Sequence, residues 1–228
     1  MVFDKGGIRM AKHSRWYLNG AMTLGLIACM SYSLLGEVLH EWLGIAVLVC
    51  FVWHILRNRA WFVTLWRGRY NSSRVAGNIV DGLILFTVLG LIVSSVMLSR
   101  YVLGFLPLSF PEGVGQTPHQ VCAYWGFLLM AVHLGWHGRA LAASVTRRVQ
   151  LPAWCWRAAL LCVVLFGAVS AAVQRFPAHL FMQVRGFELE NGLLLFLIGE
   201  AALFALCACA GAACKRFLQM KKGGPACH

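Results

Sequence analysis

Six long apolar stretches constrain this chain most, because each is about long enough to cross the ~30 Å hydrocarbon core of a bilayer. They run approximately over residues 18–36, 41–56, 79–98, 121–140, 154–173 and 193–213. Hydrophobic residues make up 60% of the 228 residues and only 8 residues are acidic, so a soluble domain could not bury the apolar surface. The sequence therefore predicts an all-α integral membrane protein with six transmembrane helices.

The formal charge of +12 is distributed as a membrane-topology signal, and we expect no nucleic-acid partner. Of the 20 Lys and Arg residues, all except Arg100, Arg175 and Arg185 lie before the first stretch, or in or beside the segments that follow the second, fourth and sixth. The positive-inside rule then places both termini in the cytoplasm. The basic, then apolar N-terminus is similar to a signal peptide, but it shows no small-residue cleavage site, so we expect the first stretch to be retained in a multi-pass protein of the cell inner (cytoplasmic) membrane.

Two histidine pairs share one spacing: His40 and His54 at the second stretch, and His119 and His133 at the fourth, are each 14 residues apart (54 − 40 and 133 − 119). Fourteen residues advance roughly 21 Å along a helix and return to within about 40° of the starting face. Because the second and fourth stretches run in the same direction, His40 would face His119 near the outer surface, and His54 would face His133 nearer the cytoplasm. Four equally spaced intramembrane histidines are hard to explain by packing alone, although one such histidine can serve as a hydrogen-bonding or proton-relay group. This pattern predicts two haem b groups whose iron atoms take these four histidines as axial ligands.

His137 adds an alternative at the inner site. It lies one helical turn after His133, so it could replace that residue as the ligand, or lie beside the haem propionates or a quinone headgroup. Asp81, near the start of the third stretch, could form a proton-linked quinone pocket with His137.

Three arginines are candidate partners for the anionic haem propionates. Arg57 and Arg139 suit the inner haem and Arg100 suits the outer one, although each residue could simply anchor its helix at the membrane surface. The nine cysteines include no C-x-x-C-H sequence, so we do not expect covalent attachment of a c-type haem.

The predicted organisation has four parts. Residues 1–17 form a cytoplasmic N-terminus, 18–145 a four-helix dihaem core of the cytochrome b type, 146–214 two additional transmembrane helices with an external loop, and 215–228 a cytoplasmic tail. The segment between Asn58 and Gly77 mixes arginine with aromatic residues, which is typical of a short helix at the membrane interface. The segments 101–118 and 174–191 are expected on the outer side.

The histidine segments resemble a known family. The sequence HEWLGI at 40–45 continues to WHIL at 53–56, and His119 is followed by HLGWH at 133–137 and by Arg139. Together these segments resemble the flavinylation-associated dihaem membrane cytochromes, a family catalogued as a domain of unknown function, over roughly residues 18–142. The resemblance implies His40, His54, His119 and His133 as ligands and His137 as the family's extra histidine. It also implies electron exchange between membrane quinone and an extracytoplasmic partner that often carries covalently bound FMN.

We therefore expect transmembrane electron transfer between the quinone pool and an extracytoplasmic redox protein, either a flavoprotein or a cytochrome c, within a membrane complex. Quinol oxidation or quinone reduction is the coupled reaction in this interpretation. One alternative is a haem-bearing anchor subunit of a dehydrogenase, hydrogenase or reductase. An alternative from another class is a non-haem metal or proton transporter that uses the same histidines. A ferric-reductase-like domain is disfavoured because its histidine pairs usually fall on the third and fifth spans.

Overall fold

The computed structural model describes residues 5–105, 110–111, 113–183 and 192–220, except for the side chains of 5–14 and 139–141. Within these ranges the regular structure is helical and no strand occurs, so the predicted all-α class is confirmed. The chain divides into two compact units, Met1–Gly68 and Arg69–His228.

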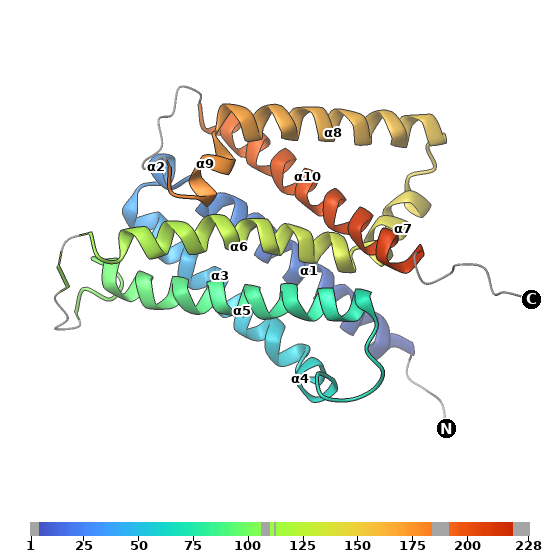
Figure 1. Cartoon of the computed structure of the whole chain (residues 1–228), viewed down its shortest axis with the longest axis horizontal. Coiled ribbons are helices and arrows are strands. Elements are labelled where there is room, and N and C mark those ends of the chain that lie inside the picture. Colours follow the sequence, from blue (N-terminus) through green and yellow to red (C-terminus); the bar gives the residue numbers. More distant parts are fainter. Residues whose placement is uncertain (1–4, 106–109, 112, 184–191, 221–228) are drawn as a thin grey trace, which may run out of the picture. The chain divides into compact units, whose positions relative to one another are not determined.

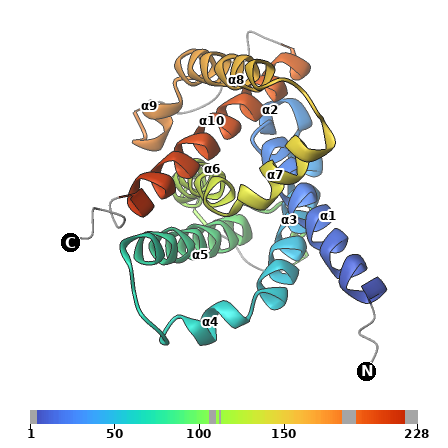
Figure 2. The same cartoon turned by 90° about the vertical axis from the view of Figure 1, so that its right-hand side faces the viewer.

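The first unit is built on two long helices that lie side by side (Figure 2). A Cβ atom on Gly25 would lie 2.6 Å from Cγ2 of Val47, so the missing side chain lets the two helices approach closely. The chain reverses at Gly36, which adopts a φ of +75° that L-residues avoid. The helices of this unit are α1 (Lys5–Cys29), α2 (Tyr32–Leu35), α3 (Glu37–Arg57) and α4 (Ala60–Thr64).

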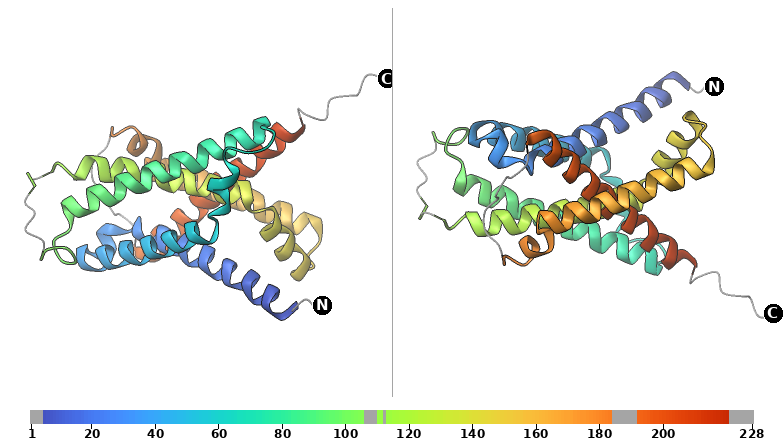
Figure 3. Two further views of the ribbon diagram at one scale, coloured as in Figure 1. Left: turned by 90° about the horizontal axis from the view of Figure 1, so that it is seen from below. Right: turned by 90° about the horizontal axis from the view of Figure 1, so that it is seen from above.

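The second unit is organised around α6, which packs against α5 and also against α10, while α8 packs on α10 (Figure 1). Figure 3 shows α8 and α10 crossing each other. Gly211 makes the contact between α10 and α6 close, because a Cβ there would lie 2.9 Å from Cα of Val132. Phe127 and Phe204 meet edge to face in the buried core between α6 and α10, with ring centroids 5.2 Å apart. The helices of this unit are α5 (Ser72–Leu98), α6 (Gln116–His137), α7 (Arg139–Arg148), α8 (Ala153–Val173), α9 (Phe176–Leu180) and α10 (Leu193–Met220).

Four helices in the described part of the chain are long and apolar enough to cross a membrane: α3, α5, α8 and α10. Many of their apolar side chains point outward, and α3 has no buried residue. Outward-facing apolar surface on this scale is what a lipid environment accommodates. Most of the first predicted stretch lies in α1 and most of the fourth in α6, and these two helices are not among the four. Basic residues in α1 and three histidines in α6 lower their mean hydropathy.

The helix boundaries differ from the predicted stretches. The first stretch is not one helix, because α1 ends at Cys29 and only the short α2 follows before Gly36. The buried Ser31 hydroxyl donates to the carbonyl of Ala28 at 2.5 Å, and such a side-chain bond competes with the backbone ladder. In the other direction α1 extends back to Lys5, so much of the predicted N-terminal segment 1–17 is helical.

The helix that contains the third stretch starts earlier than predicted. The predicted interfacial helix is short. Asn71 caps α5, since its side-chain oxygen accepts a 2.8 Å hydrogen bond from the backbone N–H of Arg74, so the helix starts at Ser72 instead of near 79. The segment 58–77 contains the five-residue helix α4, and its last residues, from Ser72, belong to α5. The compact units divide at Gly68, whereas the predicted domain boundary lies at 145/146; α6, α8 and α10 all belong to the second unit.

Candidate functional site

Both predicted ligand histidines of α6 meet a polar side chain on α5. The Nδ1 atom of His133 lies 2.7 Å from Oδ1 of Asp81. The Nδ1 atom of His119 lies 3.2 Å from the hydroxyl oxygen of Ser94 and 3.4 Å from that of Ser95. The helices that make these contacts are consecutive along the chain and pack directly on each other.

The spacing of these partners matches the spacing of the histidines. Asp81 precedes Ser94 and Ser95 by 13 and 14 residues (94 − 81 and 95 − 81), and His119 precedes His133 by 14. Two antiparallel helices that advance 1.5 Å per residue keep such sets level with each other. As a result α5 places an oxygen-bearing side chain level with each of the two histidines, His119 and His133.

The hydrogen bond to Asp81 favours one tautomer of His133, and the bond to Ser94 is compatible with the same tautomer in His119. A carboxylate oxygen only accepts, so His133 donates its Nδ1–H to Asp81 and carries its lone pair on Nε2. The Ser94 hydroxyl lies 2.7 Å from the carbonyl oxygen of Gly90 and 3.1 Å from that of Leu91, and when it donates to either carbonyl its oxygen can accept from Nδ1–H of His119. In this tautomer Nε2 is the ring nitrogen with the chemistry to bind a metal ion.

The first unit repeats this arrangement at His54. Its Nδ1 lies 3.1 Å from the side-chain oxygen of Asn19, which α1 supplies. The rings of His40 and Tyr32 meet edge to face, with their centroids 5.1 Å apart. The backbone of Cys29 is a hydrogen-bond partner of the same imidazole. Three of the four predicted ligands thus have Nδ1 held by a side-chain oxygen from a neighbouring helix.

Asp81, His133 and His137 form a compact group at the end of α6. One ligand atom from each lies within 4.8 Å of the others, and the two imidazole centroids are 4.6 Å apart. The side chains of His133 and Asp81 are 33% and 17% exposed, and His137 is exposed. The sequence predicted an association of Asp81 with His137; in the structure Asp81 bonds to His133, and His137 lies close by. Two imidazoles and a carboxylate are also a common ligand set for a transition-metal ion.

The three predicted propionate partners lie at helix ends. Arg57 is the last residue of α3, and Arg100 lies in the turn after α5. Arg139 opens α7, and its side chain lies outside the described part of the structure.

Sequence reasoning missed the oxygen partners Asn19, Ser94 and Ser95. A signal was available for the serines, because their distance from Asp81 repeats the histidine spacing. Asn19 is the only carboxamide in the stretch 18–36, but no pattern indicates which histidine it meets.

The carboxyl group of Glu200 is buried in the second unit, away from the histidine contacts. Its side chain is 0% exposed within α10, and its carboxyl oxygens have no hydrogen-bond partner among the described residues. Tyr124 of α6, whose ring stacks on His179 at 4.6 Å, lies within electrostatic range of this carboxyl group.

No protein family model, curated protein or solved structure matches this chain. The resemblance to the flavinylation-associated cytochromes therefore stays a prediction.

Proposed function

We propose that this chain is a dihaem b-type cytochrome that carries electrons across the cytoplasmic membrane, with six spans and both termini on the cytoplasmic side. The observation that carries the proposal is the hydrogen bonding of Nδ1 in His54, His119 and His133 to an oxygen on a neighbouring helix. Histidines that ligate metals almost always donate their other ring N–H in this way. Histidines that only pack between helices have no comparable need for an oxygen beside each Nδ1.

The donor set fits a haem b. Such a group takes two neutral imidazole nitrogens and, when bound, supplies reversible one-electron exchange at its iron. Gly44 lies one turn after His40 on α3, and a Cβ atom there would meet nothing within 4 Å in its own unit, so this face can accept a flat macrocycle. We assign His40 and His119 to an outer site and His54 and His133 to an inner site.

The surrounding residues hold and tune these sites. Asp81 keeps the proton of His133 on Nδ1 and makes that imidazole a stronger donor, whereas Ser94 offers His119 a neutral oxygen. Arg57 and Arg139 would neutralise propionates at the inner site, and Arg100 would do so at the outer site. The reaction partners in this proposal are a membrane quinone and an extracytoplasmic flavoprotein or cytochrome c.

A pyridine haemochrome assay with reduced-minus-oxidised spectra on the detergent-purified protein tests the proposal. We expect two b-type haems per chain. His54→Ala should lose one of them and keep the other, and the matched variant His137→Ala should keep both. A purified protein without haem, or a His54→Ala variant that retains both haems, would overturn the assignment.

The group Asp81, His133 and His137 favours a second candidate function, the binding of a non-haem transition-metal ion by a metal transporter. Elemental analysis of the same preparation separates the two candidates. Stoichiometric zinc or another transition metal without haem, lost in His137→Ala, would support the metal ion. Two equivalents of iron held as haem would exclude it at these residues.

A further inference from the structure

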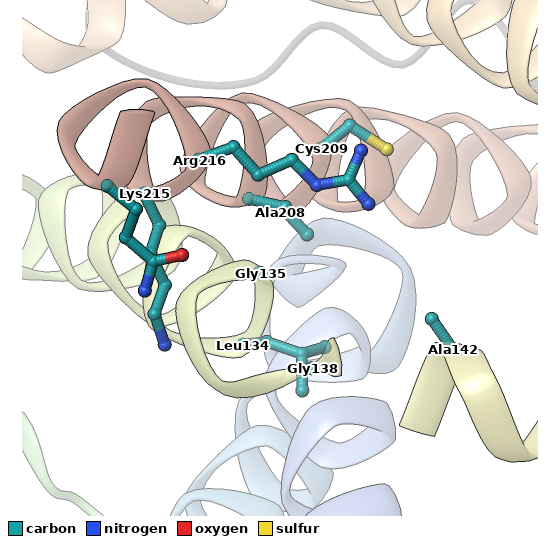
Figure 4. A pocket seen from close by; sticks show the side chains of 10 residues that line it. Leu134, Gly135, Gly138, Ala142, Ala208, Cys209, Lys215 and Arg216 are labelled. Carbon is teal, nitrogen blue, oxygen red and sulfur yellow. The ribbon is translucent and has the colours of Figure 1, made fainter. Parts of the chain in front are cut away.

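A cavity of about 270 Å³ opens in the second unit where α6, α7 and α10 meet (Figure 4). Its wall is built largely from small residues, namely Gly135 and Gly138 at the end of α6, Ala142 of α7, and Ala208 and Ala212 of α10. Side chains of this size leave an apolar hollow beside the close contact of α6 with α10. The cavity is separate from the histidine contacts described above.

Two basic residues of α10, Lys215 and Arg216, also line this cavity. The ammonium group of Lys215 donates to the carbonyl of Trp136 at 2.7 Å and lies 5.9 Å from the centroid of the Trp136 ring, which fixes it beside the end of α6. An ammonium group has three N–H donors, so this bond uses one of them. Arg216 is exposed, and Figure 4 shows its guanidinium group above Ala208.

The charge at the cavity has one sign. Among the described residues that line it, two are cationic and none is acidic. They lie near the end of a 28-residue apolar helix, where a membrane-spanning segment would reach the lipid headgroups. A soluble anion would make no use of the apolar wall, and the choline of a zwitterionic lipid would offset the attraction of its phosphate to the two cations.

We infer that this cavity binds an anionic phospholipid of the surrounding leaflet. Its phosphate lies between Lys215 and Arg216, and part of one acyl chain lies along the wall of Gly135, Ala208 and Ala212. The lipid joins α6 to α10 at the end where α6 gives way to α7. This inference does not depend on whether the protein carries haem.

The test is a titration of the full-length protein, in nanodiscs of phosphatidylcholine, with spin-labelled phosphatidylglycerol. The wild-type protein should immobilise this lipid in preference to spin-labelled phosphatidylcholine of the same chain length. Each basic residue near a membrane surface contributes an attraction that corresponds to about a fivefold change in affinity, so Lys215→Gln/Arg216→Gln should bind roughly 25-fold more weakly. The matched control is Arg147→Gln/Arg148→Gln, which removes two positive charges from the last turn of α7, outside the lining of the cavity.

Two single variants make the test independent of folding defects. Arg216→Gln leaves the bond between Lys215 and Trp136 in place and should weaken binding about fivefold. Ala212→Leu narrows the wall without changing charge and should also weaken binding. An equal loss in the Arg147/Arg148 control would show general attraction to a basic surface, and full affinity in Ala212→Leu would show that no chain enters the cavity. Either result, or equal binding of phosphatidylcholine by the wild-type protein, would overturn the inference.

Discussion

Replacement of Asp81 by Asn tests the link between the hydrogen bond of His133 and the proposed electron transfer. The substitution keeps the shape of the side chain and its oxygen acceptor but removes the negative charge that lies 2.7 Å from Nδ1 of His133. Because a carboxylate partner makes the imidazole a stronger donor, it stabilises the oxidised, more positive state of a haem bound by Nε2. We therefore expect Asp81→Asn to raise the midpoint potential of the inner haem.

The size of the shift follows from the kind of bond that is lost. A hydrogen bond to a charged group contributes about 1.5–3 kcal/mol and a neutral one about 0.5–1.5 kcal/mol, so the exchange removes roughly 1–1.5 kcal/mol. If this difference acts on the oxidised state alone, it corresponds to roughly 40–65 mV for one electron, because a tenfold change in equilibrium is about 59 mV. Ser94→Ala removes a neutral acceptor from His119 and should move the outer haem by less.

Optical redox titration of the purified variants checks this prediction. The inner haem of Asp81→Asn should titrate at higher potential while the outer haem stays where it is. His133→Ala, which should lose the inner haem, identifies which component is which. A potential that does not move in Asp81→Asn, or that moves only in the outer haem, would refute the role assigned to Asp81.

Three further predictions concern binding and stability. Gly135→Ala should destabilise the protein by at least about 1–3 kcal/mol in detergent unfolding, because the new Cβ would collide with the backbone carbonyl of Ala208, whose carbon would lie 2.7 Å away. Gly82→Ala, with nothing within 4 Å of the new Cβ, should be neutral or stabilising by up to about 1 kcal/mol, and equal effects would contradict the close contact of α6 with α10. Glu200→Met should raise the free energy of unfolding by about 1–3 kcal/mol, because it removes a buried carboxyl group that has no hydrogen-bond partner among the described residues. A loss of stability there would instead indicate a bound cation or water. Asn19→Leu should lower haem occupancy at the inner site, measured by haemochrome, by leaving Nδ1 of His54 without its amide acceptor; unchanged occupancy would remove this residue from the site.

Hydrophobic length and turn chemistry made most of the helices predictable. The four membrane-length helices α3, α5, α8 and α10 all fall on predicted apolar stretches. The boundaries were less predictable where one polar side chain decides them. Asn71 extends α5 toward the N-terminus by capping it, and Ser31 interrupts the first stretch by bonding back to Ala28. Such local bonds are worth about 1 kcal/mol, too little to appear in an average over twenty residues.

The helical class, the membrane-length helices and the equal spacing of the histidines can be read from the amino-acid sequence, because apolar length and a 3.6-residue period are local properties of the chain. Helix packing is needed to establish that Asp81 contacts His133, that His54 contacts Asn19, and that the side chain of Glu200 is fully buried. These facts depend on the rotation and axial register of one helix against another. Close approach at residues such as Gly25 and Gly211 sets that register, and it arises from the packing of segments that are distant in sequence.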